Sequence, residues 1–400
     1  MGTVTGKYLP KLRFPEFTEP WQEKRGRELF GNRRTRGNEN LPIYSVTLTN
    51  GVVPRDSLAR QGADADADSH LRAEPGDLIY NMMRMWQGAV GRTDVECMIS
   101  PAYVVLAPTK DVDSKYFAYT LQRARSIYNL WAYSYGLTDD RLRLYYRDFG
   151  FIKFHVPQLP EQKKLSTVLA TVDEKLVALR RQRELLRIYK RGLMQKIFSQ
   201  ELRFKADDGA EFPEWEEKKL GEIASLSKGQ GVAKDDVVRH GIPCVRYGEL
   251  YTTYGEVIIK VTSSIKTGSS GCVTSLVNDV LIPSSGETAI DISTASCLNV
   301  ANVAIGGDIN IIRGNFNGVF LAYYLKNFKR LDIARLAQGI SVVHLYGSQL
   351  KNLKLKLPRL EEQQKIANFL SAIDAKIDAV TYQIEKMERF KKGLLQQMFV

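Results

Sequence analysis

The chain has 400 residues, of which 44% are hydrophobic and 26% charged, and its formal net charge is +12. This length predicts two or three domains, and the positive excess favours an anionic partner, nucleic acid first, over simple solubility. No apolar run is long enough to cross a bilayer, the N-terminus lacks the features of a signal peptide, and the four cysteines form no CxxC pair. We therefore expect a reduced, cytoplasmic protein.

Residues 1–157 are predicted to form a mixed α/β domain, with a β-rich run at 102–108 and helical spacing at 114–130. Basic side chains alternate with aromatic and amide side chains in three segments that we interpret as loops. Such side chains read base edges and bind phosphates, although a charged loop is more often simply solvated. The DNA-binding candidates of this region are Arg33, Arg34, Arg36, Arg84, Trp86, Gln87, Arg141, Arg143, Tyr146 and Arg147.

Residues 158–199 are predicted to form one long helix. Apolar residues recur at alternating steps of four and three, with Arg183 and Lys190 in two gaps, which is typical of a coiled-coil seam. The seam positions are Leu165, Leu169, Val172, Leu176, Leu179, Leu186 and Leu193. A helix of about 39 residues is roughly 58 Å long, too long to lie on one small domain, so we expect a partner helix. Its basic stretch 180–191 is either a solvated face of the coiled coil, or a docking surface for another subunit or a phosphate contact.

Residues 200–357 repeat the first region. The segment FPEWEEKKLGEIA at 212–224 matches FPEFTEPWQEKRGRELF at 14–30, and this aligns Trp21 with Trp215, which we interpret as core residues. Repeats of this period must be recognised before any local assignment.

The second region has its own expected elements and candidates. We predict strands in the runs 256–262 and 300–305 and a helix over 318–336. The DNA-binding candidates are Lys228, Gln230, Lys234, Arg246, Tyr247, Gln338, Ser341 and His344.

Residues 358–400 are predicted to form a second long helix, with Lys391 in one gap of its seam. The seam positions are Ile366, Leu370, Ile373, Ile377, Val380, Ile384, Met387 and Leu394. Periodicity alone leaves parallel and antiparallel pairing open. Antiparallel pairing is favoured because the triplet LRF at 202–204, which follows the first helix, also occurs at 12–14, where a returning second helix would end.

The fold class expected from these regions is mixed α/β (α+β). Two similar domains alternate with two long helices that form an antiparallel coiled coil. The order domain, helix, domain, helix is pseudo-circular, and it predicts an approximate twofold relation with one domain at each end of a rod.

Catalytic constellations are absent from the sequence. It contains no GxxxxGK[ST] phosphate loop and no GxSxG motif, and its four histidines lack the spacing of metal ligands. The Asn/Asp-Pro-Pro tetrapeptide of amino-methyltransferases is also missing. We therefore predict no catalytic residue and no metal ligand in this chain.

These features together resemble a known family. The segments PQLPEQKK at 157–164 and PRLEEQQK at 358–365 each open a long helix, and the helices run to KRGLMQKIF at 190–198 and KKGLLQQMF at 391–399. With the repeated openings of the two regions, this pattern resembles the specificity (S) subunits of type I restriction–modification systems over nearly the whole chain. The second helix is followed by little or no tail.

The resemblance implies that each mixed region is a target recognition domain that reads one half of a split, asymmetric DNA sequence. It also implies that the helices set the gap between the halves and that two methyltransferase subunits dock here, with motor–nuclease subunits able to join. S-adenosylmethionine, ATP and Mg²⁺ are then expected on those partners, which perform adenine methylation and cleavage. Two alternatives are a coiled-coil scaffold with secondary DNA contact and a self-sufficient nuclease or methyltransferase, the latter disfavoured by the missing motifs.

Overall fold

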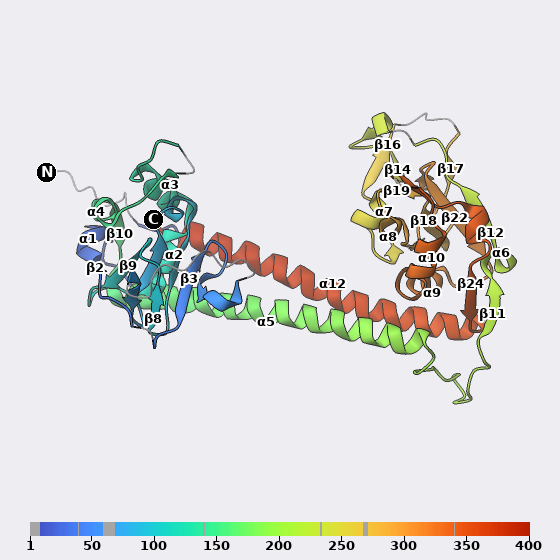
Figure 1. Cartoon of the computed structure of the whole chain (residues 1–400), viewed down its shortest axis with the longest axis horizontal. Helices are drawn as coiled ribbons and strands as arrows, with labels where there is room; N and C mark the ends of the chain where they lie inside the picture. The colour runs from blue at the N-terminus through green and yellow to red at the C-terminus, as the bar shows by residue number, and fades with distance from the viewer. Residues whose placement is uncertain are drawn as a thin grey trace. The chain divides into compact units, whose positions relative to one another are not determined.

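The computed structural model describes residues 9–38, 40–58, 69–138, 141–232, 234–266, 271–339 and 341–400. The chain divides into two compact units. Unit 1 comprises Met1–Arg180 and Tyr382–Val400, and unit 2 comprises Arg181–Thr381. The division falls within both long helices, so each unit contains one globular region and one end of each helix (Figure 1).

Unit 1 contains two four-stranded sheets and a two-stranded ribbon. The first sheet has the order β2 (Phe30–Arg33), β9 (Tyr103–Pro108), β6 (Leu78–Asn81) and β7 (Val90–Arg92). The second has the order β4 (Gly51–Pro54), β3 (Ile43–Thr47), β8 (Cys97–Ile99) and β5 (Leu71–Ala73). The ribbon pairs β1 (Gln22–Arg25) with β10 (Lys153–Val156). The helical segments are α1 (Gly26–Leu29), η1 (Arg55–Ser57), η3 (Met85–Gln87), α2 (Ser114–Leu121), α3 (Ala124–Ala132) and α4 (Tyr146–Phe149).

Unit 2 has the same plan with extra strands. Its first sheet has the order β12 (Ala224–Lys228), β22 (Ile309–Gly314), β18 (Asp279–Pro283), β20 (Ser296–Leu298) and β15 (Val257–Ile258). Its second has the order β13 (Val237–Val238), β16 (Ser263–Ile265), β14 (Ile242–Val245), β21 (Ala304–Ile305) and β17 (Val273–Thr274). Its ribbons are β11 (Glu216–Lys219) with β24 (Lys354–Leu357), and β19 (Ser285–Gly286) with β23 (Val343–His344). The helical segments are α6 (Leu220–Ile223), η5 (Lys234–Asp236), α7 (Glu249–Thr252), α8 (Ala289–Ile292), α9 (Gly318–Tyr323), η6 (Tyr324–Phe328), α10 (Arg330–Leu336) and α11 (Gly347–Leu350).

The strand pairings of the two units correspond one to one in the shared strands. β3 is parallel to β8 in unit 1, and β14 is parallel to β21 in unit 2, while each neighbouring pair is antiparallel. β6 and β18 occupy the same central position in the first sheets. The mixed fold and the internal repeat expected from the sequence are therefore confirmed.

Local differences from the expected elements have local causes. The run 114–130 breaks into α2 and α3 because Arg123 is extended (φ −74°, ψ 146°) and donates a hydrogen bond to the backbone oxygen of Val400 (2.7 Å). The run 318–336 is divided by the π-helical turn η6. The expected strand 256–262 shortens to β15, since the chain turns to solvent at Ile259, which is 77% exposed.

The long helices α5 (Leu159–Phe198) and α12 (Leu360–Gln397) pack side by side in each unit (Figure 1). In unit 1, Asp173 pairs with Lys391 and Arg180 with Glu388, both at 2.6 Å. The residue number on α12 falls as that on α5 rises, so the pairing is antiparallel, as expected. The predicted seam positions are buried except Leu186, Leu193 and Met387, which are half-buried.

A lysine interrupts the apolar seam in unit 2. The Nζ atom of Lys190 lies 2.7 Å from a carboxylate oxygen of Asp374 on the facing helix and 4.8 Å from the ring centre of Tyr323. The Tyr323 hydroxyl also donates to Asp374. A buried cation is costly unless a counter-charge and hydrogen bonds surround it, so this position allows only a register that brings Asp374 opposite Lys190.

Unit 1 contains the same triad with the two helices exchanged. Here Lys391 is on α12 and pairs with Asp173 on α5 at 2.6 Å, with Nζ 5.3 Å from the ring centre of Tyr119. The Tyr119 hydroxyl donates to Asp173 at 2.8 Å. This exchange of roles is the pseudo-twofold, pseudo-circular organisation expected from the repeated sequence.

The first turn of α12 is anchored to the globular region by a buried carboxylate. Glu362 is fully buried and accepts hydrogen bonds from Arg203 (2.9 Å) and from Nε1 of Trp215 (3.3 Å). The next residue, Gln363, donates to the backbone oxygen of Pro358 at 2.9 Å. The glutamate and glutamine of the helix-opening motif therefore serve the junction between helix and domain.

The first turn of α5 repeats this junction. Glu161 accepts from Arg13 (2.7 Å) and from Nε1 of Trp21 (3.3 Å), so both tryptophans are core residues as predicted. The backbone N–H of Leu12 bonds to the oxygen of Gln397 (2.9 Å), which places the LRF triplet at the end of α12 as expected.

Replacing Glu362 by Gln is expected to destabilise unit 2 by about 2 kcal/mol, because the half-buried Arg203 and the buried Trp215 lose a charged acceptor. Hydrogen exchange of peptides covering 200–220 and 360–372 measures the effect locally. Glu361, which is exposed one position earlier in the same turn, provides the control: Glu361→Gln should leave exchange unchanged. Equal effects of the two substitutions would contradict this assignment.

Candidate nucleic-acid interface

In unit 2 the predicted DNA-binding segments meet at one end of the first sheet. Backbone hydrogen bonds of 2.9 to 3.0 Å join loop 229–231 to loop 305–309. Loop 305–309 also forms backbone hydrogen bonds with Val245 (2.9 Å) and with Ser284 (2.8 Å). Ser284 then accepts from the N–H of Leu345 at 3.0 Å. This edge therefore collects the segments that carry Lys228, Gln230, Arg246, Tyr247, Gln338, Ser341 and His344. The side chain of Lys234 lies outside the described residues.

A hairpin closed by one antiparallel bridge occurs at the matching place in both units. Tyr135 and Arg143 form an antiparallel bridge in unit 1, and Gln338 and His344 form one in unit 2. After each bridge the next residue bonds back to the sheet, as Leu144 does to the oxygen of Met82 at 3.0 Å. The structure thus makes Arg143 and His344 equivalent positions, a correspondence that the sequence analysis did not identify.

Each hairpin depends on a glycine. A Cβ on Gly136 would lie 2.5 Å from the backbone oxygen of Arg141, and one on Gly339 would lie 2.1 Å from that of Val342. Gly339 also has φ +127°, which disfavours any side chain. The two glycines therefore allow the close backbone approach beside each bridge, while the residues between the bridged positions differ in sequence.

In unit 1 two of the three predicted segments lie together. The segment with Arg84, Trp86 and Gln87 follows β6, and the hairpin bonds to its first residues. Trp86 donates to the backbone oxygen of Met83 (3.0 Å), and Arg84 donates to Gln87 (3.2 Å). The third segment follows β2 and bonds to β5 in the second sheet, where the N–H of Arg72 reaches the oxygen of Thr35 (2.8 Å).

The remaining candidates of unit 1 differ in exposure. Tyr146 is half-buried and donates to the backbone oxygen of Phe30 at 2.7 Å, which is a packing role. The exposed candidates are Arg34, Arg36, Arg84, Arg141, Arg143 and Arg147. In unit 2 the exposed candidates are Lys228, Gln230, Tyr247, Gln338, Ser341 and His344.

Arg33 has a structural partner. Its Nε lies 2.7 Å from Asp77, which is buried at the start of β6, and this hydrogen bond raises the pKa of Arg33. In unit 2 the matching Asp279 is also buried and pairs with Arg313 at 2.6 Å, from a different strand. The buried aspartate occupies the same position in both units, whereas its arginine partner comes from a different strand in each. The requirement shared by the two units is therefore a positive charge beside the buried aspartate.

Arg246 is similarly engaged. Its Nε and Nη2 atoms both contact Glu249, at 3.0 and 2.8 Å, and this pairing raises the pKa of Arg246. The neighbouring Tyr247 is exposed and its ring centre lies 6.5 Å from that of Tyr251. The sequence could not reveal the Arg246 pairing in advance, because an i, i+3 Arg–Glu spacing is common on helices and loops alike.

Sequence reasoning missed a group of exposed aromatic residues beside the unit 1 segments. Tyr128 and Trp131 on α3 are 64% and 45% exposed, with ring centres 5.8 Å apart. α3 packs on η3, the turn that contains Trp86. Exposed rings stack on bases or on partner side chains, and their three-residue spacing on one helix was the signal that could have identified them.

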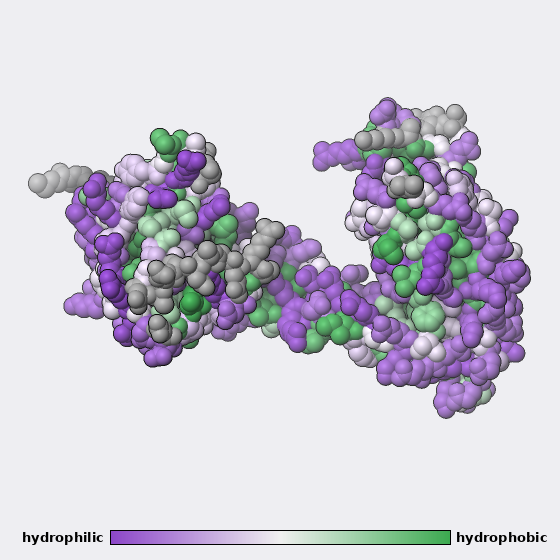
Figure 2. Space-filling view, viewed as in Figure 1, coloured by the Kyte–Doolittle hydropathy of each residue, from purple (hydrophilic) through white to green (hydrophobic). Residues whose placement is uncertain are grey.

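The surface of unit 2 is not uniformly basic. Figure 2 shows apolar residues in the middle of the visible face and hydrophilic residues along its outer edge. Ile290 of α8 and Leu331 of α10 are exposed, at 42% and 62%. Basic residues at the sheet edge therefore coexist with apolar surface in the same unit.

Other chemistry-bearing side chains are buried. Burial raises the pKa of the Cys244 thiol to about 11 and that of Cys297 to about 12, so both pack as neutral side chains at neutral pH. Among the described residues, no group of three or more His, Cys, Asp or Glu side chains could hold a metal ion. Within the same part of the chain, no helix is long and apolar enough to span a membrane.

Comparison with known proteins gives the same family as the sequence motifs. Residues 213–389 match the model of the type I restriction modification DNA specificity domain. The type I restriction enzyme MjaVIII specificity subunit of Methanocaldococcus jannaschii is 24% identical over 306 residues, 72% of this chain and 69% of that protein. The putative MjaX specificity subunit of the same organism is 24% identical over 304 residues, 73% and 69% of the two chains.

Solved structures share the fold over nearly the whole chain. The S subunit of a type I system from M. genitalium superposes with a TM-score of 0.61 at 16% identity, covering 98% of this chain and 99% of that one. A chain from a study of complex assembly in the type I R-M system gives 0.56 at 17% identity, covering 96% and 98%. The resemblance to type I specificity subunits is therefore confirmed.

The pairing of Arg33 with Asp77 predicts that this arginine acts on stability. Arg33→Ala should cost about 1–2 kcal/mol, because Asp77 is left buried without its cation. Arg34→Ala, at the exposed next position, should stay within about 0.5 kcal/mol. Denaturant unfolding with hydrogen exchange in peptides covering 74–82 measures both, and equal losses would argue against a structural Arg33.

Proposed function

Because this chain resembles the specificity subunits of type I restriction–modification systems, we propose that it selects the DNA sequence on which such a complex acts. Each unit reads one half of a bipartite, asymmetric site, and the paired helices set the gap between the halves. The observation that carries this proposal is the duplicated scaffold, in which matching hairpins present different side chains. The chain itself is non-catalytic in this proposal.

Unlike side chains at matching places support unlike half-sites. Where unit 1 presents Arg143, unit 2 presents His344, and the loops after β2 and β12 also differ. An arginine reads guanine through two hydrogen bonds, whereas a histidine offers a single donor or acceptor per nitrogen. Two readers with different chemistry select a non-palindromic sequence.

The lysine–aspartate pairs of the helix seam support a fixed gap between the two half-sites. The Lys190–Asp374 and Lys391–Asp173 pairs allow one axial register, so the helices act as a ruler whose length is set by residue count. Two readers on the same face of B-DNA favour centres about one helical turn, roughly 10 base pairs, apart.

The partners in this proposal are double-stranded DNA, two methyltransferase subunits and motor–nuclease subunits. Those subunits carry S-adenosylmethionine, ATP and Mg²⁺ and perform adenine methylation and cleavage. A second candidate, a protein scaffold with secondary DNA contact, is favoured by the exposed aromatic pair on α3. Sequence-specific binding that weakens steeply with salt distinguishes DNA reading from scaffolding.

Exchange of residues 22–156 for those of a relative with a different target should change one half of the methylated motif and leave the other intact. Sequencing of methylated DNA from cells that carry the complete system measures this. Arg143→Ala should relax the same half, at a cost of about 1–3 kcal/mol for the correct base, and His344→Ala should affect only the other half. A change in both halves from either single variant would count against independent readers.

Deletion of 181–187 from α5 alone should abolish specific binding, because the seam on one side of the deletion loses its register. Matched deletion of 181–187 and 378–384 keeps both lysine–aspartate pairs and should shorten the gap by about three base pairs, at 1.5 Å per residue and 3.4 Å per base pair. The methylated motif of cells with each variant reports the gap. An unchanged gap after the matched deletion would refute the ruler.

A further inference from the structure

The segment that opens β4 in unit 1 and the segment that leads into β15 in unit 2 lie beside matching strands, although β4 pairs with β3 and β15 with β20. Their sequences are TNGVV at 49–53 and TYGEV at 253–257. Gly51 packs against Gly91 of β7, and the oxygen of Gly255 accepts a hydrogen bond from Ser296 of β20, the strand that matches β7. This alignment places Val52 in unit 1 where unit 2 has Glu256.

In unit 2 Glu256 completes the setting of the seam lysine. Its carboxylate lies 3.4 Å from Nζ of Lys190 and accepts from Asn327 at 3.2 Å. Burial opposes ionisation of Glu256, yet Lys190 and Lys326 hold its pKa below the ordinary value. Lys190 therefore has two carboxylates, Asp374 from the facing helix and Glu256 from the turn, and its side chain is 11% exposed.

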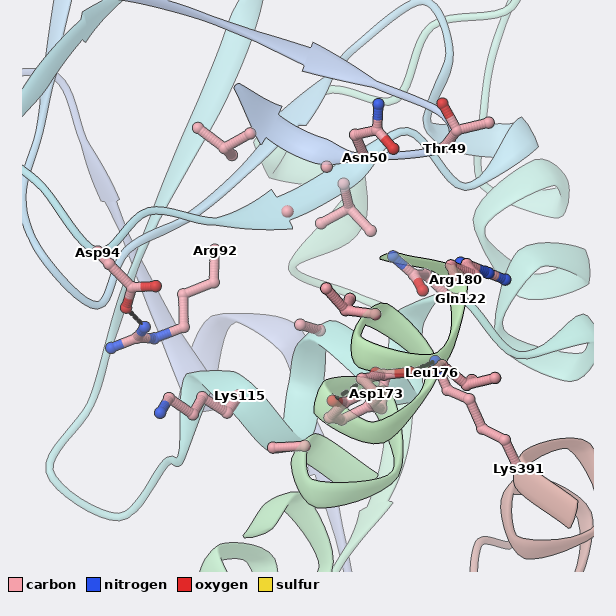
Figure 3. A pocket seen from close by; sticks show the side chains of 18 residues that line it. Thr49, Asn50, Arg92, Asp94, Lys115, Gln122, Asp173, Leu176, Arg180 and Lys391 are labelled. Carbon is pink, nitrogen blue, oxygen red and sulfur yellow. Dashed lines mark hydrogen bonds and ion pairs between the residues drawn. The ribbon is translucent and has the colours of Figure 1, made fainter. Parts of the chain in front are cut away.

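In unit 1 the same place is an open groove of about 480 Å³ (Figure 3). Val52 and Gln122 line it at the positions that match Glu256 and Lys326, and Lys391 reaches in from α12. Lys391 has a single carboxylate, that of Asp173, and its side chain is 25% exposed. The groove therefore contains the lysine of the triad without the second acid that unit 2 supplies.

The lining of the groove is cationic on balance. Arg92 pairs with Asp94, Lys391 with Asp173 and Arg180 with Glu388, which lies outside the lining, and Lys115 adds a further positive charge. Figure 3 shows Asn50 on one wall and Asp173 on the opposite wall, formed by α5. Neutral polar side chains, such as Asn50 and Gln122, and apolar ones, such as Val52 and Leu176, line the rest. A site of this kind fits a carboxylate on a segment that carries both polar and apolar side chains.

We infer that this groove accepts a carboxylate-bearing segment of a partner polypeptide, whose acid contacts Lys391 as Glu256 contacts Lys190. The inference rests on the proposed function, in which the partner is the methyltransferase subunit. A protein carboxylate is favoured over a DNA phosphate because the occupant of the matching site is a glutamate, which Lys190 and Asn327 contact. Unit 2 carries that acid within its own chain, so the two units dock partners differently.

The test gives unit 1 the acid that unit 2 already has. In the full-length chain, Val52→Glu should place a carboxylate on Lys391 and weaken binding of the methyltransferase subunit of the same system at least tenfold. Val52→Thr, which keeps the shape and adds no charge, should change the affinity less than twofold. Gln122→Glu, at the exposed position that follows α2, is a second way to add the charge and should weaken binding in the same direction.

Calorimetric titration of the methyltransferase subunit into each variant gives the affinities, and thermal unfolding verifies that each is folded. Wild-type affinity in both folded acidic variants would overturn the inference and leave the proposed function standing. Loss of duplex DNA binding with unchanged methyltransferase binding would overturn it in favour of a phosphate. An unmodified chain that binds no methyltransferase subunit would overturn the proposed function, and this inference with it.

Discussion

The pairing of a seam lysine with an aspartate on the facing helix is the interaction on which the rest of this structure depends. An apolar heptad seam slides easily between registers, because one leucine layer resembles the next. Lys190 and Lys391 remove that freedom, since each cation is tolerated only beside its aspartate. Because Tyr323 and Tyr119 belong to the globular regions and bond to the same aspartates, the register of the helices is tied to the domains in each unit.

Anchoring and reading are performed by different parts of each unit. Buried charges hold the scaffold: Glu161 and Glu362 at the first turns of the helices, and Asp77 and Asp279 at the starts of the central strands. These buried carboxylates occur at matching positions in both units, and in each unit an arginine pairs with them. The residues between the bridged positions of the hairpins and the loops after β2 and β12 do not contribute these buried carboxylates. A protein built this way can change its target by changing loops without disturbing its core.

Comparison of the two units also shows that one position of the shared fold has a different role in each. Glu256 closes the space between a turn and the helices in unit 2, whereas Val52 leaves the matching space open in unit 1. A buried carboxylate beside a lysine stabilises its own unit. An open cationic groove at the same place is available to another molecule. Comparison of the two copies within one chain therefore separates what the fold requires from what it permits.

The sequence by itself determined the repeat, the two long helices, the seam and the antiparallel arrangement, because heptad spacing and the returning LRF segment are local signals that burial preserves. It also placed Trp21 and Trp215 in the core. It missed the break at Arg123, where a distant backbone oxygen binds the side chain, and it made the strands expected at 256–262 and 300–305 too long, since only 257–258 and 304–305 pair with neighbours. Only the tertiary structure decided that Arg33 and Arg246 serve ion pairs, that Arg143 and His344 are equivalent, and that Lys391 faces an open groove. Those outcomes depend on which side chains meet across long sequence separations, and residue spacing carries no information about such contacts.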